Sequence, residues 1–267
     1  MKKHDWILKK PIAHRGLHCE KIPENSIAAF EAAIKAGLPI EIDVQLSKDK
    51  VPVIFHDDCL SRLTGHKKKR LTKVKFEDLQ KLTIGDTDLG IPTFKEFLDF
   101  VDGRVPILIE IKKNKGSKGI EKIVIDMLKD YKGEYAIQSF HPIAIRKVRK
   151  MDPEIFCGLL SSKLSDLKML RIKKAAVKNA RLFFMAKPDF VSFEINSFPN
   201  RRVKKFREEL DLPIIGWTIR TKEDIERACE YCDGIIFENI ENLKSYVQNI
   251  SEGDTILGQV AFPQGTD

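Results

Sequence analysis

The chain has 267 residues, of which 42% are hydrophobic and 32% are charged, and its net charge is +8 at pH 7. This length suits one large domain or two small ones, and the apolar content excludes an intrinsically disordered chain. A basic chain attracts nucleic acid, anionic membrane surfaces or small anionic substrates. The positive charge is spread out, and the densest run, residues 66–70, has no aromatic residues for stacking on bases. We therefore expect a small anionic substrate and no nucleic-acid partner.

The five cysteines are odd in number and scattered, which argues against a disulfide framework. Cys229 and Cys232 have C-x-x-C spacing, but no second pair exists to complete a zinc site. No apolar segment follows the polar start of the chain as in a signal peptide, and no apolar run approaches the ~18 residues of a membrane span. We expect a cytoplasmic protein without a membrane span.

Eight short apolar runs predict β-strands. Several are continuous rather than alternating, which is typical of parallel strands buried on both faces. The predicted strands cover residues 11–14, 40–44, 105–111, 135–139, 155–160, 190–193, 214–218 and 234–237.

Segments with helical periodicity lie between these strands. The first covers residues 26–36 and is followed by Gly37, a residue that commonly ends a helix. Thr221 is expected to cap the helix that follows it. The remaining predicted helices cover residues 120–128, 141–151, 201–210, 222–232 and 240–250.

Eight strands alternating with helices predict an α/β fold, the TIM (β/α)8 barrel. We expect a single barrel domain over residues 1–250 and a C-terminal tail over residues 251–267. Residues 57–93 contain no clear βα unit and are charged, with scattered glycines, which indicates a small insertion after the second strand. Just before it, residues 51–56 are expected to return as a short strand after a turn at residues 47–50.

Three acidic residues lie near the ends of two predicted strands. Glu41 and Asp43 are two positions apart and so share one face of their strand, and Glu110 and Lys112 repeat this spacing on a later strand. The C-terminal ends of barrel strands build the active site. Carboxylates gathered there repel one another unless a cation lies between them, and oxygen ligands favour one hard divalent cation, Mg²⁺ or Ca²⁺. Salt bridges at the rim are the competing interpretation.

Two histidines also occupy strand ends. His14 ends the first strand, and His56 ends the apolar run after the turn. Imidazoles titrate near neutrality, so this pair can serve as acid and base. Arg15 is suited to bind a phosphate through two parallel hydrogen bonds. Trp217, at the end of the seventh strand, either covers the carbon skeleton of a substrate or packs in the core.

Several segments, in this order and spacing over residues 11–245, resemble the glycerophosphodiester phosphodiesterase family. Any one of them would be a weak signal, but their order and spacing together are highly specific. They are Ile12-Ala13-His14-Arg15-Gly16, Pro23-Glu24-Asn25-Ser26, Glu41-Ile42-Asp43-Val44, Val53-Ile54-Phe55-His56-Asp57, Ile109-Glu110-Ile111-Lys112, Ser139-Phe140-His141, Gly216-Trp217-Thr218 and Cys232-Asp233-Gly234-Ile235-Ile236.

The resemblance implies a TIM barrel with a small insertion, and a small-molecule glycerophosphodiester that is hydrolysed to sn-glycerol 3-phosphate and an alcohol. Family members often carry a Thr-Asp-x-Pro type of turn after the final strand, where this chain has Phe237-Glu238-Asn239-Ile240. The resemblance also implies site roles: a divalent cation held by Glu41, Asp43 and Glu110, an acid–base pair of His14 and His56, and phosphate contacts from Arg15 and Lys112. We assign His14 as base and His56 as acid, an order that the sequence does not fix.

Two other functions compete with this one. A lysophospholipase D would use the same site on lipids that retain one acyl chain, and would need an apolar groove at the barrel mouth. A non-catalytic phosphate-binding barrel is the alternative from another class, since fold does not fix function. Such a barrel should have lost a histidine or a carboxylate of the site, and none is missing here. The sequence makes no prediction of the oligomeric state.

Overall fold

A computed structural model describes residues 4–65, 69–162 and 185–238. The chain divides into two compact units. Of the described residues, those between Ile12 and Tyr135 form the N-terminal unit, and residues 4–11 with those between Ala136 and Glu238 form the C-terminal unit.

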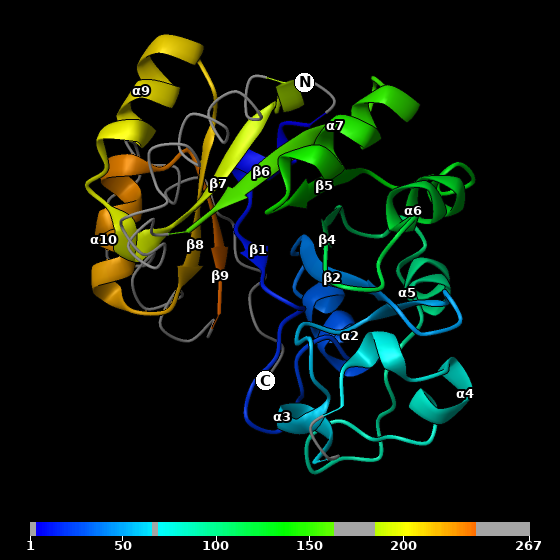
Figure 1. The fold of residues 1–267 in the computed structure, drawn as a ribbon. Helices are drawn as coiled ribbons and strands as arrows, with labels where there is room; N and C mark the ends of the chain where they lie inside the picture. Colours follow the sequence, from blue (N-terminus) through cyan, green and yellow to red (C-terminus); the bar gives the residue numbers. More distant parts are fainter. Residues whose placement is uncertain (1–3, 66–68, 163–184, 239–267) are drawn as a thin grey trace, which may run out of the picture. The chain divides into compact units, whose positions relative to one another are not determined.

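The N-terminal unit is built on a short parallel sheet (Figure 1). A further strand pairs with the middle strand of this sheet. The strands β1 and β4 pair in parallel with β2, and β3 pairs with β2 in antiparallel orientation. The strands are β1 (Ile12–Ala13), β2 (Ile40–Leu46), β3 (Pro52–Ile54) and β4 (Ile107–Ile111). The helices are α2 (Ile27–Lys35), α3 (Ser61–Thr64), η1 (Leu71–Lys73), α4 (Phe76–Leu79), α5 (Phe94–Val101) and α6 (Ile120–Leu128).

The C-terminal unit contains five strands that pair in parallel in the order of the sequence, β5 to β9. They are β5 (Tyr135–Ser139), β6 (Cys157–Ser161), β7 (Phe190–Glu194), β8 (Ile214–Ile219) and β9 (Gly234–Phe237). The described helices of this unit are α1 (Trp6–Lys9), α7 (Pro142–Met151), η3 (Ile195–Ser197), α9 (Arg201–Leu210) and α10 (Lys222–Tyr231).

Eight parallel strands alternating with helices are the topology of a TIM (β/α)8 barrel, with β3 as an extra strand. The predicted fold class is confirmed, and each of the eight predicted strands is present. The returning strand predicted within residues 51–56 is β3. The helix predicted over residues 240–250 and the tail over residues 251–267 lie outside the described residues.

The described residues of the segment 57–93 form the short helices α3, η1 and α4, which pack around a small hydrophobic cluster. The buried members of that cluster are Val53, Phe55, Leu60, Leu71, Val74, Leu79, Ile84 and Ile91. The segment therefore has a local core of its own, as the predicted insertion requires. The boundaries given above for a single barrel domain stay a prediction.

Burial and capping explain why these segments form. Every residue of β2 and β4 is buried, as their isoleucine-rich sequences predict for strands covered on both faces. Three helices begin at a residue whose hydroxyl accepts a backbone N–H, namely Ser26 for α2, Thr93 for α5 and Thr221 for α10. The predicted cap at Thr221 is confirmed.

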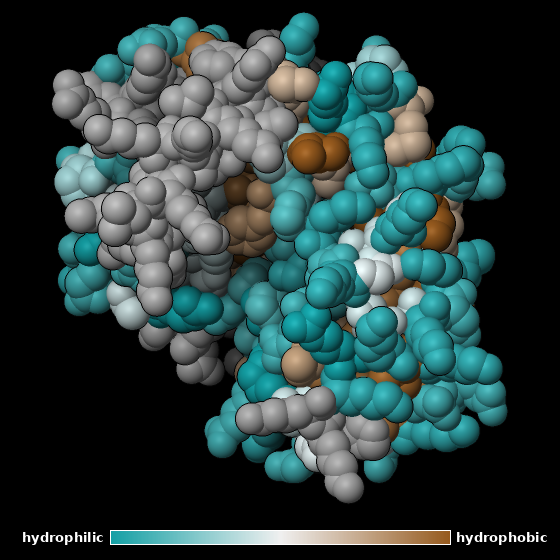
Figure 2. Space-filling model, viewed as in Figure 1, coloured by the Kyte–Doolittle hydropathy of each residue, from teal (hydrophilic) through white to brown (hydrophobic). Residues whose placement is uncertain are grey.

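The face shown in Figure 2 is mostly hydrophilic, with apolar surface in small patches. None of the described helices combines the length and the apolar character needed to cross a membrane. All five cysteines are free thiols.

Candidate active site

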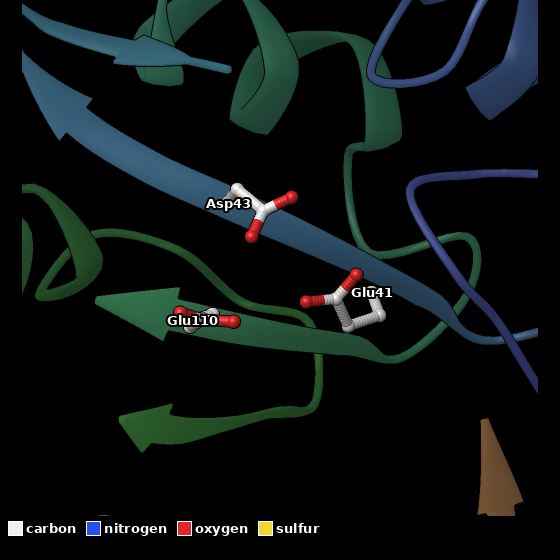
Figure 3. A group of neighbouring side chains, drawn as sticks. All are labelled: Glu41, Asp43 and Glu110. Carbon is white, nitrogen blue, oxygen red and sulfur yellow. The ribbon is translucent and has the colours of Figure 1, made fainter. Parts of the chain in front are cut away.

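Three carboxylates converge where β2 and β4 lie side by side (Figure 3). Asp43 is the register partner of Glu110, and Glu41 lies two residues earlier on the same face of β2. Each side chain offers a carboxylate oxygen, and these atoms all lie within 4.8 Å of one another. All three residues are buried. Adjacent parallel strands thus bring together the acidic residues that the sequence placed at two strand ends.

The two glutamates are held in an environment that disfavours their charge. Burial raises the pKa of Glu41, and the neighbouring carboxylates Asp43 and Glu110 raise it further. Burial also raises the pKa of Glu110, to about 7, against the attraction of Lys112. Burial would raise the pKa of Asp43 as well, but the cations of Lys112 and Arg15 outweigh it and lower that pKa. One carboxylate of the cluster is therefore firmly ionised.

Lys112 lies between two of the carboxylates. Its Nζ is 3.1 Å from Oδ1 of Asp43 and 3.0 Å from Oε1 of Glu110. The same Oδ1 of Asp43 is buried and accepts no hydrogen bond of good geometry among the described residues. Three carboxylates face the two cations of Lys112 and Arg15, so full ionisation leaves an excess of negative charge. Oxygen ligands with an unfilled acceptor and excess negative charge fit a hard divalent cation.

His14 and Arg15 follow β1 in a tight turn. The backbone of Arg15 is left-handed, with φ 57°, as is that of Gly16, with φ 80°. A Cβ on Gly16 would lie 2.8 Å from Cβ of Ala29, so only glycine lets the turn pack on α2. In this turn the Arg15 N–H donates to Oε2 of Glu41 at 3.1 Å, and Nε2 of His14 lies 3.9 Å from the same oxygen.

The side chain of Arg15 is held by carboxylates on two sides. Its Nε lies 3.3 Å from Oδ2 of Asp43, and its Nη1 donates to Oε1 of Glu24 at 2.7 Å. Asn25 also donates to Oδ2 of Asp43, at 3.0 Å. The guanidinium is thus fixed beside the carboxylate cluster, where we predicted a phosphate contact.

His56 follows β3, and a backbone hydrogen bond of the preceding residue determines where it lies. The Phe55 N–H donates to the carbonyl of Asp43 at 2.9 Å, which places this segment beside β2. Nδ1 of His56 lies 2.7 Å from Oδ1 of Asp57. Burial lowers the pKa of His56, against the attraction of Asp43. A third of the side chain remains exposed, so the ring is accessible while Asp57 fixes its orientation.

Two positioning residues were missed in the sequence. Gln45 lies on β2 and donates from Nε2 to the carbonyls of Phe55, His56 and Asp57 at 2.7, 3.1 and 2.9 Å. Its position continues the alternation of Glu41 and Asp43, which was the signal that could have found it. The second is Arg62 on α3, whose segment we interpreted only as an insertion.

Arg62 connects the two sides of the site. Its guanidinium donates to both carboxylate oxygens of Asp57, at 2.6 and 3.1 Å, and to both of Glu24, at 2.9 and 2.7 Å. Asp57 contacts His56, and Glu24 contacts Arg15. Arg62 therefore holds Asp57, which contacts the predicted catalytic residue His56. It also holds Glu24, which contacts Arg15, the predicted phosphate contact. No role for Glu24 was predicted from the sequence.

Trp217 belongs to the C-terminal unit, on β8. Its ring meets Phe140 edge to face, with centroids 5.6 Å apart, and its Nε1 is buried without a hydrogen-bond partner among the described residues. Its role in binding substrate stays a prediction. The other seven predicted site residues all lie in the N-terminal unit.

The glycerophosphoryl diester phosphodiesterase family model matches residues 14–242. The chain belongs to this family. It is therefore an enzyme of the phosphoric diester hydrolase class. A glycerophosphodiester phosphodiesterase of Caldanaerobacter subterraneus subsp. tengcongensis is 32% identical over 251 residues, which are 89% of this chain and 97% of that protein.

Solved structures agree on the fold. A glycerophosphoryl diester phosphodiesterase from Silicibacter pomeroyi has a TM-score of 0.76 at 18% identity, covering 92% of this chain and 97% of its own. A phosphodiesterase from Oleispira antarctica, solved in complex with the product sn-glycerol-3-phosphate, has a TM-score of 0.74 at 23% identity, covering 90% and 97%. These similarities support the (β/α)8 fold of the family.

Proposed function

We propose that this protein hydrolyses glycerophosphodiesters to sn-glycerol 3-phosphate and an alcohol. The observation that carries the proposal is the buried cluster of Glu41, Asp43 and Glu110 in a chain of this family. Arginine, lysine and histidine side chains surround the cluster, as cleavage of an anionic diester requires. The product named for the Oleispira antarctica relative supports the choice of glycerol 3-phosphate.

We further propose that the three carboxylates hold one divalent cation, Mg²⁺ or Ca²⁺. Such a cation, when bound, would stabilise negative charge that develops on a phosphate oxygen. Arg15 and Lys112 already lie beside the same carboxylates, so their positive charges would reach a phosphate bound there. The two side chains would bind and orient the substrate.

The two histidines would move the protons. In this proposal His14 accepts a proton from the nucleophile, which is either water or the 2-hydroxyl of the glycerol. His56 donates a proton to the leaving alcohol, and its lowered pKa makes the protonated ring a stronger acid than an ordinary imidazolium. Asp57, at 2.7 Å from Nδ1, would hold the ring in place and stabilise the protonated form. Each such residue contributes ~10²–10⁴-fold to the rate.

Release of glycerol 3-phosphate from a panel of glycerophosphodiesters tests the proposal. The full chain is assayed with Mg²⁺, with Ca²⁺ and with a chelator. We expect turnover with a divalent cation and its loss with the chelator. Glu110→Gln, which keeps shape but removes charge, and His14→Ala should each lower kcat by about 100-fold or more.

The matched control is Asp126→Asn, the same type of change at an exposed carboxylate that pairs with Lys122 and Lys129 on α6. It should keep full activity. Wild-type turnover that is unchanged in Glu110→Gln or in His14→Ala would contradict the mechanism. Faster choline release from lysophosphatidylcholine than from glycerophosphocholine would instead identify a lysophospholipase D.

The cytoplasmic location and the absence of a nucleic-acid partner also stay predictions. Cell fractionation tests the first, and retention on DNA at low salt tests the second.

A further inference from the structure

The helix α7 has a surface unlike that of the other described helices. The chain has four exposed large hydrophobic residues in its described part, and three of them accompany α7: Phe140 just before it, Ile143 in its first turn and Met151 at its end. Their exposed fractions are 40%, 52% and 43%. Single exposed apolar residues are ordinary on a protein surface, but three gathered around one helix indicate a contact surface.

The charges of α7 have one sign. The helix contains four cations and no acidic residue, which sets it apart from the other described helices of eight residues or more. In those helices lysines pair with acids four positions away, as in Lys35–Glu31, Lys95–Asp99 and Lys122–Asp126. Nothing within α7 neutralises its cations in this way.

The apolar and cationic residues share one face. Ile143, Arg146, Lys147 and Lys150 are all exposed, at positions i, i+3, i+4 and i+7, which form one stripe along a helix. The opposite face, with Ala144, Ile145 and Val148, is buried. Arg149 lies off the stripe and pairs with Asp189. The stripe thus combines the exposed aliphatic side chain of Ile143 with the exposed cations Arg146 and Lys150, while Lys147 has an interaction of its own. Figure 1 shows where α7 lies.

We propose that this α7 surface, formed by Phe140, Ile143, Arg146, Lys150 and Met151, docks the protein on an anionic phospholipid surface. Cations near such a surface are attracted to its lipid head groups, and apolar side chains beside them enter the boundary with the acyl chains. Single-stranded nucleic acid fits less well, because stacking needs free aromatic rings. Phe140, the one aromatic of the surface, already contacts Trp217. The proposal does not rest on the substrate proposed above.

Co-sedimentation with lipid vesicles tests the proposal. The full chain is mixed with vesicles of phosphatidylcholine alone or with added anionic phosphatidylglycerol. We expect binding to the anionic vesicles only, and weaker binding at high salt. The double variant Arg146→Glu/Lys150→Glu should lower the partition coefficient by about 30-fold or more, because each cation contributes about fivefold. Ile143→Ser should lower it by about tenfold.

The matched control is Lys122→Glu/Lys129→Glu, which makes the same change in net charge on α6. It should retain vesicle binding, and all variants should keep wild-type hydrolysis of a water-soluble diester. The proposal is overturned if the wild type does not bind anionic vesicles. It is also overturned if both double variants lose vesicle binding equally, because binding would then depend on net charge alone. It is also overturned if the α7 variants lose DNA retention or self-association while vesicle binding persists.

Discussion

At the scale of single residues, the candidate site depends on how charges are paired. Asp43 is surrounded by Lys112, Arg15 and Asn25, whereas Glu41 and Glu110 have raised pKa values. Arg62 lies outside the carboxylate cluster and holds both Asp57 and Glu24. Such a residue acts through its neighbours by fixing their geometry.

Arg62→Gln is expected to lower kcat by about 10- to 100-fold, because Asp57 and Glu24 lose the shared cation that orients them. Arg62→Lys should recover little of this loss, since an ammonium cannot make two bidentate contacts. Steady-state kinetics measure both. Lys81→Gln is the control, because Lys81 lies in the same segment and its partners are exposed. This variant should keep the wild-type kcat. A loss of thermal stability in Arg62→Gln with unchanged kcat would show a purely structural role.

At the scale of elements, caps place the helices that follow the site strands. Ser26 caps α2 directly after Glu24 and Asn25, so the residues that hold Arg15 and Asp43 are fixed by a helix start. Thr93 begins α5 with a reciprocal capping box: its hydroxyl accepts the Glu96 N–H, and the Glu96 carboxylate accepts the Thr93 N–H at 2.7 Å. The interaction satisfies donors that a helix start otherwise leaves unpaired.

Thr93→Ala should therefore destabilise the protein by about 1 kcal/mol. For a chain of this size that corresponds to a melting temperature lower by about 2–4 °C, measured by calorimetry. Thr93→Ser keeps the capping hydroxyl and should stay near the wild-type value. Equal melting temperatures for the alanine variant and the wild type would mean that tertiary packing alone sets this helix start.

At the scale of the whole molecule, the raised pKa of Glu110 couples stability to pH, and a cation bound as proposed would change that coupling. The raised pKa of Glu110, about 7, means that the folded protein without a cation retains a proton that the unfolded chain has released. This contribution to stability is complete below the unfolded value of about 4.3 and is lost as pH rises through about 7. The divalent cation that we propose for this cluster would bind the ionised carboxylates and so would replace the proton over the same range.

The increase in melting temperature caused by Mg²⁺ or Ca²⁺ should consequently be larger at pH 8 than at pH 6. Thermal melts with cation and with chelator at both pH values measure it. In Glu110→Gln the cation-dependent increase should shrink at pH 8, because one ligand is gone. A cation effect of equal size at both pH values, or one that persists in Glu110→Gln, would speak against the cluster as the binding site.

The sequence by itself determined the barrel and the carboxylate cluster, because both follow from local periodicity. Continuous apolar runs indicated buried parallel strands, and the two-residue spacing put Glu41 and Asp43 on one face of β2. The tertiary structure alone decided which residues surround that cluster. Arg62 meets Glu24 from 38 positions away, and Gln45 binds carbonyls ten to twelve positions later. The turn after β2 was predicted from its own residues, but the partners that Arg62 and Gln45 reach depend on contacts between distant segments, and no local pattern of side chains encodes those.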